Sequence, residues 1–512
     1  MIPSIKRAWD EAPLPLILIL AMILRLIAVI FARGWGMFDD HYLVIESAQS
    51  WVDGLDEPVW LPWNPLNTGP TGHMLFYPGF HFVLFSVLEF LGMTDPQAKM
   101  FVVRLIHAAF SLLTIIYAYR IAEKLDGKRS ARLIGLLLAA LWIMPWLSVR
   151  NLIEEVCVPF LVMAFWQMIR KDQPTRPFLT FLTAGILFGL ATDIRLQSVL
   201  FPLGAGLVIL FRKQWRELLG LTIGTVIPVV LVLGTIDLFL WGYPFAELLG
   251  YIRVCYIEKD IYISLPWYNY FLTVLGLLIP PVSLFLFFGF LRNWRKYTLL
   301  FVPAVLFFAF HSYFPNKQER FILPFLPFLI LLGVMGWYQF IDSSRFWQKN
   351  RSLLRGCWIF FWVVNLILLS VITVNYSKRA RVESMVYLSK YPDIQQMLVA
   401  DDGNRSEQFP RFYLGQWAHI YGDLSLVGTS DSLIQTVARF PKELHPRFIL
   451  FMGEGDLQER VVKARESFPY LVYETTVKPG MIDDILHRLN PFNRNETVTI
   501  YRNLEFFPTR LN

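Results

Sequence analysis

Two adjacent carboxylates follow the first long apolar stretch of the chain. They are Asp39 and Asp40 in MFDDHYLVIE (37–46), directly after a run of about twenty apolar residues, the length that crosses a bilayer as a helix. Ionised groups at a membrane exit are costly unless water or a partner meets them. A carboxylate there could take the proton of a hydroxyl during group transfer, and a nearby cation could stabilise a departing phosphate. Alternatively, both acids solvate a loop or cap its first helix.

The composition indicates the setting for this chemistry. The chain has 512 residues, of which 55% are hydrophobic and 17% charged, which is too apolar for a soluble protein of this length and predicts a polytopic membrane protein. The net charge of +7 is attributed to cytoplasmic loops, so no nucleic-acid partner is expected. Three widely spaced cysteines without a CxxC pattern favour neither disulfides nor a zinc site.

Apolar runs of about twenty residues are expected to cross the bilayer as helices, because lipid offers no partner to open backbone groups. The sequence predicts about eleven spans, near residues 14–33, 100–121, 132–148, 154–169, 177–193, 196–211, 217–240, 268–290, 298–314, 321–341 and 356–375. The segment 73–93 carries two histidines, a proline and a glutamate, so a re-entrant or interfacial helix is as reasonable as a span.

The distribution of charge argues that 73–93 does not cross. In that case the basic clusters all fall on one side, as the positive-inside rule expects. These clusters are Lys6 with Arg7, 124–132, 170–176, 212–216, 292–296 and 345–355. The first outer loop, 34–99, has no Lys or Arg between residues 34 and 72. The carboxylates of this loop are therefore predicted to face the extracytoplasmic side, as are four polar stretches at 149–155, 193–197, 237–267 and 316–320.

The C-terminal part differs in character from the rest. Residues 447–452, 471–477 and 497–503 have the pattern of strands, and 457–468 and 481–489 that of helices. We expect a mostly α-helical membrane protein, with a transmembrane module over 1–375 and a small α/β domain over 376–512. An odd number of spans places this domain on the extracytoplasmic side.

An extracytoplasmic enzyme has little access to nucleotide sugars, so activated sugar must arrive in lipid-linked form. A polyprenyl-phosphate sugar meets this need, because its tail stays in the bilayer. Asp39 is our candidate for the general base, with Asp40 as a second catalytic acid or a cap. Lys317 and Arg320, at the outer end of a span, suit a lipid phosphate. Anchoring of the interface by snorkelling is the alternative for these two cations.

Other polar residues have two readings each. Arg195 could bind the donor phosphate or pair with Asp193. Glu154 could contact substrate or act as an ordinary acid in a first helical turn. Four histidines, at 41, 73, 81 and 311, lie near the outer face, but no pair has a convincing ligand spacing. No metal site and no other cofactor is therefore predicted, although a divalent metal is conceivable.

Three motifs resemble those of the GT-C glycosyltransferases, most closely the dolichyl-phosphate-mannose-dependent α-mannosyltransferases of N-glycan and GPI-anchor assembly. The first is FDDHYLVIE (38–46), the second TIDLFLWGYPFAELLGYIR followed by LPWYNYF, and the third HSYFPNKQERFILPFLP (311–327). In the third motif, Asn316 and Gln318 replace the His and Glu of the family, and Glu319 follows Gln318 directly. The resemblance implies a GT-C fold with short helices in the first outer loop, an inverting mechanism, and substrate contacts from His41, Glu46, Asp237, Tyr243, Trp267, Tyr268, Asn316, Gln318 and Glu319.

The sequence therefore predicts a membrane glycosyltransferase. It would move a hexose, with mannose as the first candidate, from a polyprenyl-phosphate donor to a glycan or lipid-linked acceptor. The expected location is a bacterial inner membrane with the site facing the periplasm, or the lumenal face of the ER membrane if the host is eukaryotic. The rival hypotheses are a lipid-linked glycan flippase and a catalytically silent scaffold. A transporter would favour polar groups at the bilayer midplane and internal repeats, whereas here polar groups gather at one face.

Overall fold

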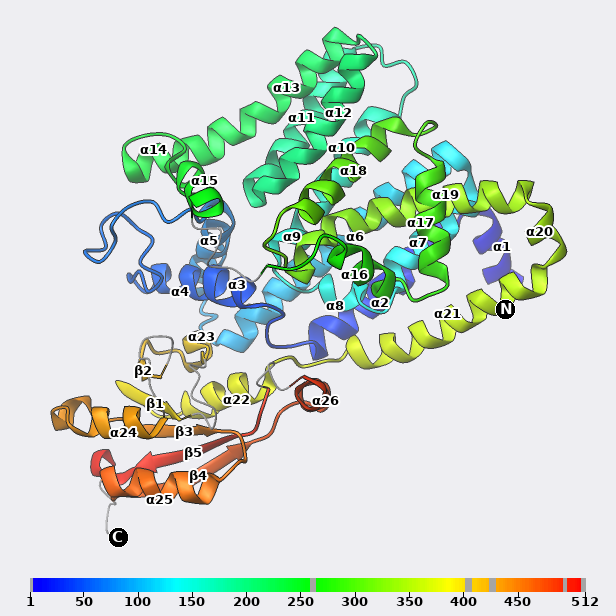
Figure 1. Cartoon of the computed structure of the whole chain (residues 1–512). Coiled ribbons are helices and arrows are strands. Elements are labelled where there is room, and N and C mark those ends of the chain that lie inside the picture. Colours follow the sequence, from blue (N-terminus) through cyan, green and yellow to red (C-terminus); the bar gives the residue numbers. More distant parts are fainter. Residues whose placement is uncertain (1–2, 258–263, 401–407, 423–429, 491–494, 508–512) are drawn as a thin grey trace. The chain divides into compact units, whose positions relative to one another are not determined.

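The computed structural model describes residues 3–257, 264–400, 408–422, 430–490 and 495–507 (Figure 1). Its contacts divide the chain into two compact units. The helical unit contains Met1–Ala32, Ser50–Leu84 and Phe101–Val374, and the mixed unit contains Arg33–Gln49, Phe85–Met100 and Asn375–Asn512. The mixed unit thus combines part of the first loop with the C-terminal segment, a grouping that the predicted boundary after residue 375 does not include.

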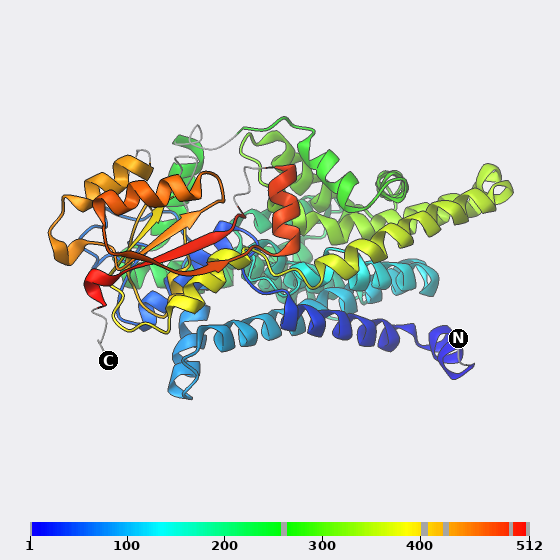
Figure 2. The same cartoon turned by 90° about the horizontal axis from the view of Figure 1, so that it is seen from below.

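Helices make up most of the described chain as far as residue 374. In chain order they are α1 (Pro3–Glu11), α2 (Pro13–Phe31), α3 (Phe38–His41), α4 (Ser47–Val52), α5 (Phe76–Phe90), α6 (Pro96–Asp126), α7 (Lys128–Ala140), α8 (Met144–Leu147), α9 (Ile153–Val156), α10 (Val158–Ile169), α11 (Pro177–Ile194), α12 (Leu200–Phe211), α13 (Trp215–Val229), α14 (Thr235–Trp241), α15 (Ala246–Ile257), α16 (Asn269–Leu277), α17 (Val282–Arg292), α18 (Thr298–Tyr313), α19 (Leu326–Ser343), α20 (Arg345–Lys349) and α21 (Arg351–Ile372). Short 3-10 or π turns join some of them, namely Tyr42–Glu46, Leu196–Val199, Val230–Gly234 and Glu319–Phe325. Figure 2 shows long helices of the helical unit, dark blue α2 and yellow-green α21 among them, running in one general direction.

The predicted number of eleven spans is not confirmed. Six described helical stretches are long and apolar enough to cross a membrane, or seven if α16 and α17, bent by 118°, form one span. Two predicted spans, 132–148 and 154–169, contain helices of only 13 and 12 residues, α7 and α10. The sequence pattern overestimates their length because an apolar run continues through turns and through prolines at helix starts. The ambiguous segment 73–93 contains α5, a 15-residue apolar helix shorter than the six.

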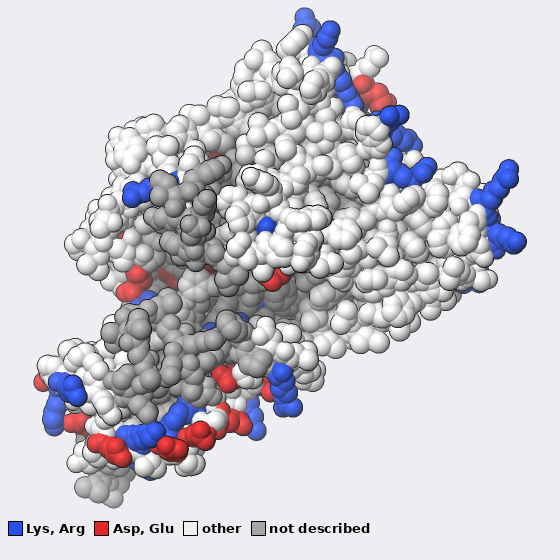
Figure 3. Space-filling model, viewed as in Figure 1, with Lys and Arg blue, Asp and Glu red and all other residues white. Residues whose placement is uncertain are grey.

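The basic clusters meet at one end of the helical unit. Arg129 forms an ion pair with Asp342 at 2.8 Å, and Lys124 forms one with Asp172 at 2.9 Å. Arg132 donates to the carbonyl oxygen of Asp10 at 2.8 Å. We call this end, where α2 begins and α6 and α19 finish, the basic end. In Figure 3, Lys and Arg line the edge of the helical unit that carries α20 and the turn between α12 and α13.

The C-terminal part of the mixed unit is an α/β sandwich. Its five-stranded sheet has the order β2-β1-β3-β5-β4, parallel among the first three strands and antiparallel at β5 and β4. The strands are β1 (Gln396–Ala400), β2 (His419–Tyr421), β3 (Phe448–Met452), β4 (Leu471–Val477) and β5 (Val498–Asn503), and the helices are α22 (Arg379–Leu388), α23 (Arg411–Leu414), α24 (Ser430–Ala438), α25 (Leu457–Ser467) and α26 (Met481–Leu489). A buried apolar core joins α24 and α25 to β1 and β3. The strands and helices expected at 447–503 are present within one or two residues.

A backbone contact joins the segments that follow α2 and α21. Within the mixed unit, the N–H of Ser377 donates to the carbonyl oxygen of Arg33 at 3.2 Å. Arg33 follows the end of α2 by two residues and Ser377 follows the end of α21 by five. This bond joins the start of the first loop to the segment that leads into the C-terminal domain.

Candidate active site

Three buried side chains converge at the end of the helical unit remote from its basic end. The Glu154 carboxylate oxygen Oε1 lies 2.5 Å from Arg195 and 3.5 Å from Nε of Arg320. Their exposed fractions are 0%, 3% and 4%. Glu154 lies in the short helix α9, Arg195 follows the last residue of α11, and Arg320 lies in the 3-10 turn that leads into α19. Three helix ends therefore deliver the three charges to one point.

An aromatic ring and a lysine complete this cluster. The ring of Phe321 lies 4.9 Å from the guanidinium carbon of Arg195 and 5.3 Å from that of Arg320. Lys317 is buried and its ammonium donates to the carbonyl oxygen of Phe314. Burial lowers the pKa of Lys317, because the charged form loses hydration. Lys317 lies three residues before Arg320 on the same loop. We call Arg195, Lys317 and Arg320 the cation cluster.

The loop that carries two of these cations is held by a tyrosine. The hydroxyl of Tyr270 donates to the carbonyl oxygen of Gln318 at 3.1 Å and accepts from the N–H of Gln318 at 3.2 Å. On the same loop, Asn316 forms an antiparallel bridge with Ser264. Asn316 and Gln318 are thus part of the support for the cluster, whereas Glu319 is exposed.

Part of this buried cluster lacks partners. Arg195 and Arg320 both meet the Glu154 carboxylate, and in the described part of the chain Nε and Nη2 of Arg195 have no hydrogen-bond partner. Buried charged donors without a partner are expensive unless an anion meets them. Two guanidinium groups and an ammonium are donors suited to phosphate. The arrangement can therefore hold a phosphate group beside the membrane.

The predicted alternative for Arg195, a pair with Asp193, is not what the structure shows. Arg195 pairs with Glu154, and both carboxylate oxygens of buried Asp193 lack a hydrogen-bond partner among the described residues. The sequence could not reveal this choice, because Glu154 is 41 residues away in the chain.

The predicted acid pair Asp39 and Asp40 lies in the mixed unit, and the two residues differ in burial. The carboxylate of Asp40 is buried and accepts from the backbone N–H of Gly36 at 2.9 Å and of Met37 at 3.1 Å. It therefore acts as the cap of α3. Asp39, one residue earlier in the same turn, is only half-buried. This difference fits the expectation that one acid of the pair caps a helix.

The exit of α2 lies at the same end of the helical unit as the site. A buried cluster packs Ala28, Val29 and Ala32 of that exit against Ala108 and Val149. Val149 precedes the stretch that contains Glu154 by five residues. The chain therefore begins its first loop at the same end of the helical unit as the cation cluster.

Comparison with known proteins identifies the family. The model of the Alg9-like mannosyltransferase family matches residues 16–421. The chain belongs to this family. The expected membership among GT-C glycosyltransferases is thereby confirmed. Mannosyltransferase APTG1 of Arabidopsis thaliana is 23% identical over 326 residues, which are 62% of this chain and 57% of that protein.

Solved structures show the same fold. Crystal structures of ArnT from Cupriavidus metallidurans, one bound to undecaprenyl phosphate and one in the apo state, match with TM-scores of 0.59 and 0.61. Each is 15% identical and the match covers 95% of this chain and 97% of that chain. The oligosaccharyltransferase of Archaeoglobus fulgidus tethered to an acceptor peptide matches with a TM-score of 0.50 at 12% identity, over 91% of this chain and 73% of that chain. The GT-C fold thus extends over nearly the whole of this family member.

Two further residues of the first motif are buried within the mixed unit. His41 stacks on Tyr413 with ring centroids 5.4 Å apart. Glu46 accepts from the N–H of Phe412 at 3.2 Å, and its Oε1 lies 3.5 Å from Nε2 of His41. These contacts give both residues a structural function in joining the first loop to α23. Substrate contact by His41 and Glu46 remains a prediction.

The second motif of this family member supplies a support and an exposed aromatic surface. The carboxylate of Asp237 accepts from the N–H of Glu247 at 3.0 Å and so holds the start of α15. Tyr243, Trp267 and Tyr268 are 45%, 71% and 45% exposed. Exposed rings of this kind can pack on the faces of a sugar, so the predicted substrate contacts of these three residues stand as hypotheses.

Sequence reasoning missed Glu247. Its carboxylate is buried and accepts from the backbone N–H of Gly72 at 2.6 Å and of His73 at 3.2 Å. Gly72 is required there, since its φ is +83° and a Cβ would lie 2.8 Å from the backbone nitrogen of Tyr251. Tyr251 in turn accepts from the side-chain amide of Gln197, two residues after Arg195. The sequence offered one signal for this structural function of Glu247, namely an acid shortly after a Gly-Tyr-Pro turn.

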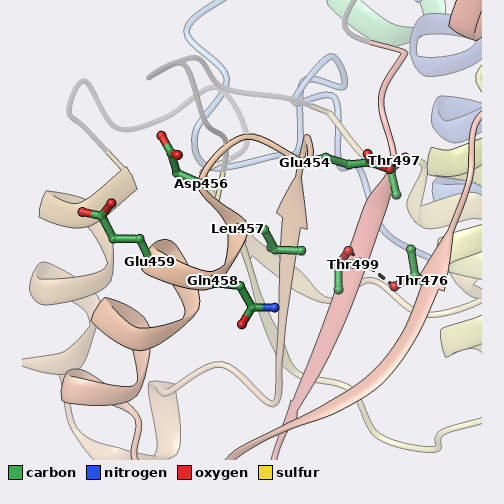
Figure 4. Close-up of a pocket in the computed structure, with 8 residues that line it drawn as sticks. All are labelled: Glu454, Asp456, Leu457, Gln458, Glu459, Thr476, Thr497 and Thr499. Atoms are coloured by element: carbon green, nitrogen blue, oxygen red, sulfur yellow. Dashed lines mark hydrogen bonds between the residues drawn. The ribbon is translucent and has the colours of Figure 1, made fainter.

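A separate hollow lies in the C-terminal domain. Its volume is about 620 Å³, and it is lined by Glu454, Asp456, Leu457, Gln458, Glu459, Thr476, Thr497 and Thr499 (Figure 4). Its lining contains three carboxylates and no cation, so it does not suit a phosphate. Among the described residues, no group of three or more His, Cys, Asp or Glu is arranged to hold a metal ion.

Proposed function

We propose that this protein is a glycosyltransferase that moves a hexose from a polyprenyl-phosphate donor to a glycan or lipid-linked acceptor. Mannose is the first candidate, on the basis of the family. The observation that carries the proposal is the buried site at which Arg195 and Arg320 meet the Glu154 carboxylate, at one end of a helical unit that contains the candidate membrane spans. The ligand of the ArnT structure, undecaprenyl phosphate, belongs to the same chemical class.

The cation cluster holds the donor phosphate in this proposal. Arg195 and Arg320 are fixed by the Glu154 carboxylate and by Phe321, so their donors are oriented before the substrate arrives. Such preorganised donors stabilise the charge that develops on a leaving group. The polyprenyl tail would remain in the bilayer while its phosphate reaches these helix ends.

Asp39 is the proposed general base. Asp40 is engaged as a cap, which leaves Asp39 as the acid of the pair with the more exposed carboxylate. Asp39 follows Ala32 by seven residues, so the extended chain limits their separation to about 25 Å. In the proposal, Asp39 acts on the same lipid-linked sugar whose phosphate the cation cluster holds.

The proposed reaction is a single displacement at the anomeric carbon. Asp39 takes the proton of the acceptor hydroxyl while the hydroxyl oxygen forms the new glycosidic bond. The bond between the anomeric carbon and the phosphate oxygen breaks, and the electron pair leaves with the polyprenyl phosphate. Arg195, Arg320 and Lys317 stabilise that phosphate. One displacement inverts the anomeric configuration.

The proposed setting is a bacterial inner membrane with the site facing the periplasm, or the lumenal face of the ER in a eukaryote. The basic end, with its Lys and Arg ion pairs, would then face the cytoplasm.

A flippase is the rival function, and one experiment separates the two. The purified protein is reconstituted in liposomes with polyprenyl-phosphate [¹⁴C]mannose and a lipid-linked oligosaccharide acceptor. We expect a radiolabelled glycosidic product that resists mild acid, under conditions that hydrolyse the donor. Movement of the donor between leaflets without such a product would favour the flippase. Repeating the assay with EDTA tests the expectation that no divalent metal is required.

A further inference from the structure

The helix α26 has an exposed apolar face that its own domain does not cover. Its sequence is MIDDILHRL, and successive residues turn by about 100° around a helix axis. Met481, Ile485 and Leu489 therefore lie along one side, with exposed fractions of 69%, 47% and 78%. Such a short helix with one polar and one strongly apolar side is typical of segments at a membrane surface.

The opposite side of α26 is fixed to its unit by a buried carboxylate. Asp483 is 2% exposed and accepts from the N–H of Arg379 at 3.2 Å and from the amide of Asn495 at 3.3 Å. The Asn495 amide oxygen accepts from Lys378 at 2.7 Å. At the start of the helix, Gly480 packs so closely that a Cβ would lie 3.1 Å from the carbonyl oxygen of Tyr376. The apolar face is thus held outward and does not belong to a loosely attached helix.

The residues that hold α26 come directly after a membrane span. Tyr376 follows the last residue of α21, Ile372, by four residues, which an extended chain bridges in at most about 14 Å. α21 is a 22-residue candidate span with only 17% of its apolar window buried inside the protein, as expected for a helix that faces lipid. Within the same unit, Ser377 is hydrogen-bonded to Arg33, just after the end of α2. The covalent chain therefore ties α26 to the level at which two spans leave the bilayer.

The charges around this attachment also suit a lipid surface. Lys378 and Arg379 follow α21 within seven residues, and Lys478 precedes α26. On the polar side of the helix, Arg488 pairs with Asp484 at 2.8 Å. Basic residues beside a span are attracted to anionic headgroups. An apolar face that contacts lipid must lie near the end of a membrane span. An apolar face that contacts another protein has no such requirement, so the attachment of α26 to residues just after α21 favours lipid.

We propose that α26 lies in the headgroup region of the leaflet from which α2 and α21 emerge, with Met481, Ile485 and Leu489 inserted among the acyl chains. The helix is a second membrane attachment of the C-terminal domain, in addition to the covalent connection through α21. It limits how far this domain can swing away from the bilayer. The inference depends on the membrane setting alone and not on the proposed transfer reaction.

Site-directed fluorescence tests the proposal on the full-length protein. A version with its three cysteines replaced by serine receives Leu489→Cys, is labelled with NBD, and is reconstituted in nanodiscs of phosphatidylcholine with a minor share of phosphatidylglycerol. Asp484→Cys, on the polar side of the same helix, is the matched control. We expect blue-shifted emission at position 489 that doxyl-labelled lipid quenches several-fold more than iodide does, and the reverse at 484. Quenching at 489 by iodide as strong as at 484, or by neither agent, would overturn the proposal.

A second measurement uses the unmodified chain and does not depend on the folding of variants. Nanodiscs are prepared with a photoactivatable diazirine lipid, and labelled peptides are mapped by mass spectrometry. Label on 481–489 and on α21, but not on α25, supports insertion of α26. Label on α21 without label on 481–489 contradicts it.

Discussion

At the scale of single residues, Glu154 determines the geometry of the candidate site. Its carboxylate meets Arg195 at 2.5 Å and Arg320 at 3.5 Å without solvent exposure, so the two guanidinium groups keep one relative orientation. Removal of one member of a buried ion pair leaves an uncompensated charge. We therefore expect the three side chains to behave as one unit whose purpose is to present donors to a phosphate.

Loss of one arginine should reduce transfer strongly. We expect Arg320→Gln to lower kcat/KM for the polyprenyl-phosphate donor by about 10²–10³-fold, because a preorganised donor to the leaving phosphate is lost. Steady-state assays in nanodiscs measure this effect. Arg216→Gln, at an exposed arginine in α13 near the opposite end, is the matched control and should retain activity. Equal activity of both variants would exclude Arg320 from the phosphate site.

Glu247 should make the stability of the protein depend on pH. Burial raises the pKa of this carboxyl from 4.5 to about 7, so the folded protein holds a proton that the unfolded chain releases. The stabilisation is therefore complete below the unfolded value and is lost as pH rises through 7. We expect the Tm of the wild type to fall between about pH 5 and about pH 8 more than that of Glu247→Gln, whose side chain stays neutral.

Thermal unfolding followed by intrinsic fluorescence checks this prediction. Glu443→Gln, at an exposed acid of the C-terminal domain, should follow the wild-type curve. Parallel curves for the wild type and Glu247→Gln would show that the carboxyl carries no such linkage.

At the scale of elements, helix ends build this protein's polar sites. α9, α11 and the turn before α19 each contribute one charge to the cluster, and the exits of α2 and α21 are joined through Arg33 and Ser377. Because helices in lipid must satisfy their backbone internally, functional groups gather where the helices finish. The first loop follows the end of α2, and the C-terminal domain follows the end of α21.

Gly34 is the element-scale position where substitution should be most damaging. Its φ is +72°, and an added Cβ would lie 1.8 Å from the carbonyl oxygen of Ser377. We expect Gly34→Ala to destabilise the protein by more than about 2 kcal/mol, since the left-handed backbone and a rigid neighbouring backbone oppose the side chain together. Gly356→Ala, in α21 with nothing within 4 Å of its Cβ, should leave Tm unchanged or slightly raised. Similar Tm values for the two variants would contradict the account of this junction.

The sequence predicts elements well where local patterns suffice. The alternating strand at 471–477 and the amphipathic helix at 481–489 appear as β4 and α26, because their periods are visible over a few residues. Span lengths are predicted less well, since an apolar run does not show the bend of 118° between α16 and α17. In the site, residue types and sidedness indicated Arg195 and Arg320, but their common partner Glu154 depends on packing between distant segments, which the sequence does not show.

At the scale of the whole molecule, the chain consists of a helical unit and a mixed unit. Membership of the Alg9-like mannosyltransferase family covers both, since the match extends to residue 421, beyond α23 in the C-terminal domain. His41 and Glu46 of the first loop pack against α23. We infer that the C-terminal domain supports the loop that carries Asp39. A substitution in α23 should therefore alter the conformation of this loop.

The central claim is that Asp39 and the cation cluster act on one lipid-linked sugar. The most direct measurement is product formation by Asp39→Asn in nanodiscs with radiolabelled donor bound, compared with Asp53→Asn, an exposed acid of the same loop. The account predicts that Asp39→Asn binds the donor with wild-type affinity but forms at least about 10²-fold less product, while Asp53→Asn remains active. Full transfer by Asp39→Asn would contradict it.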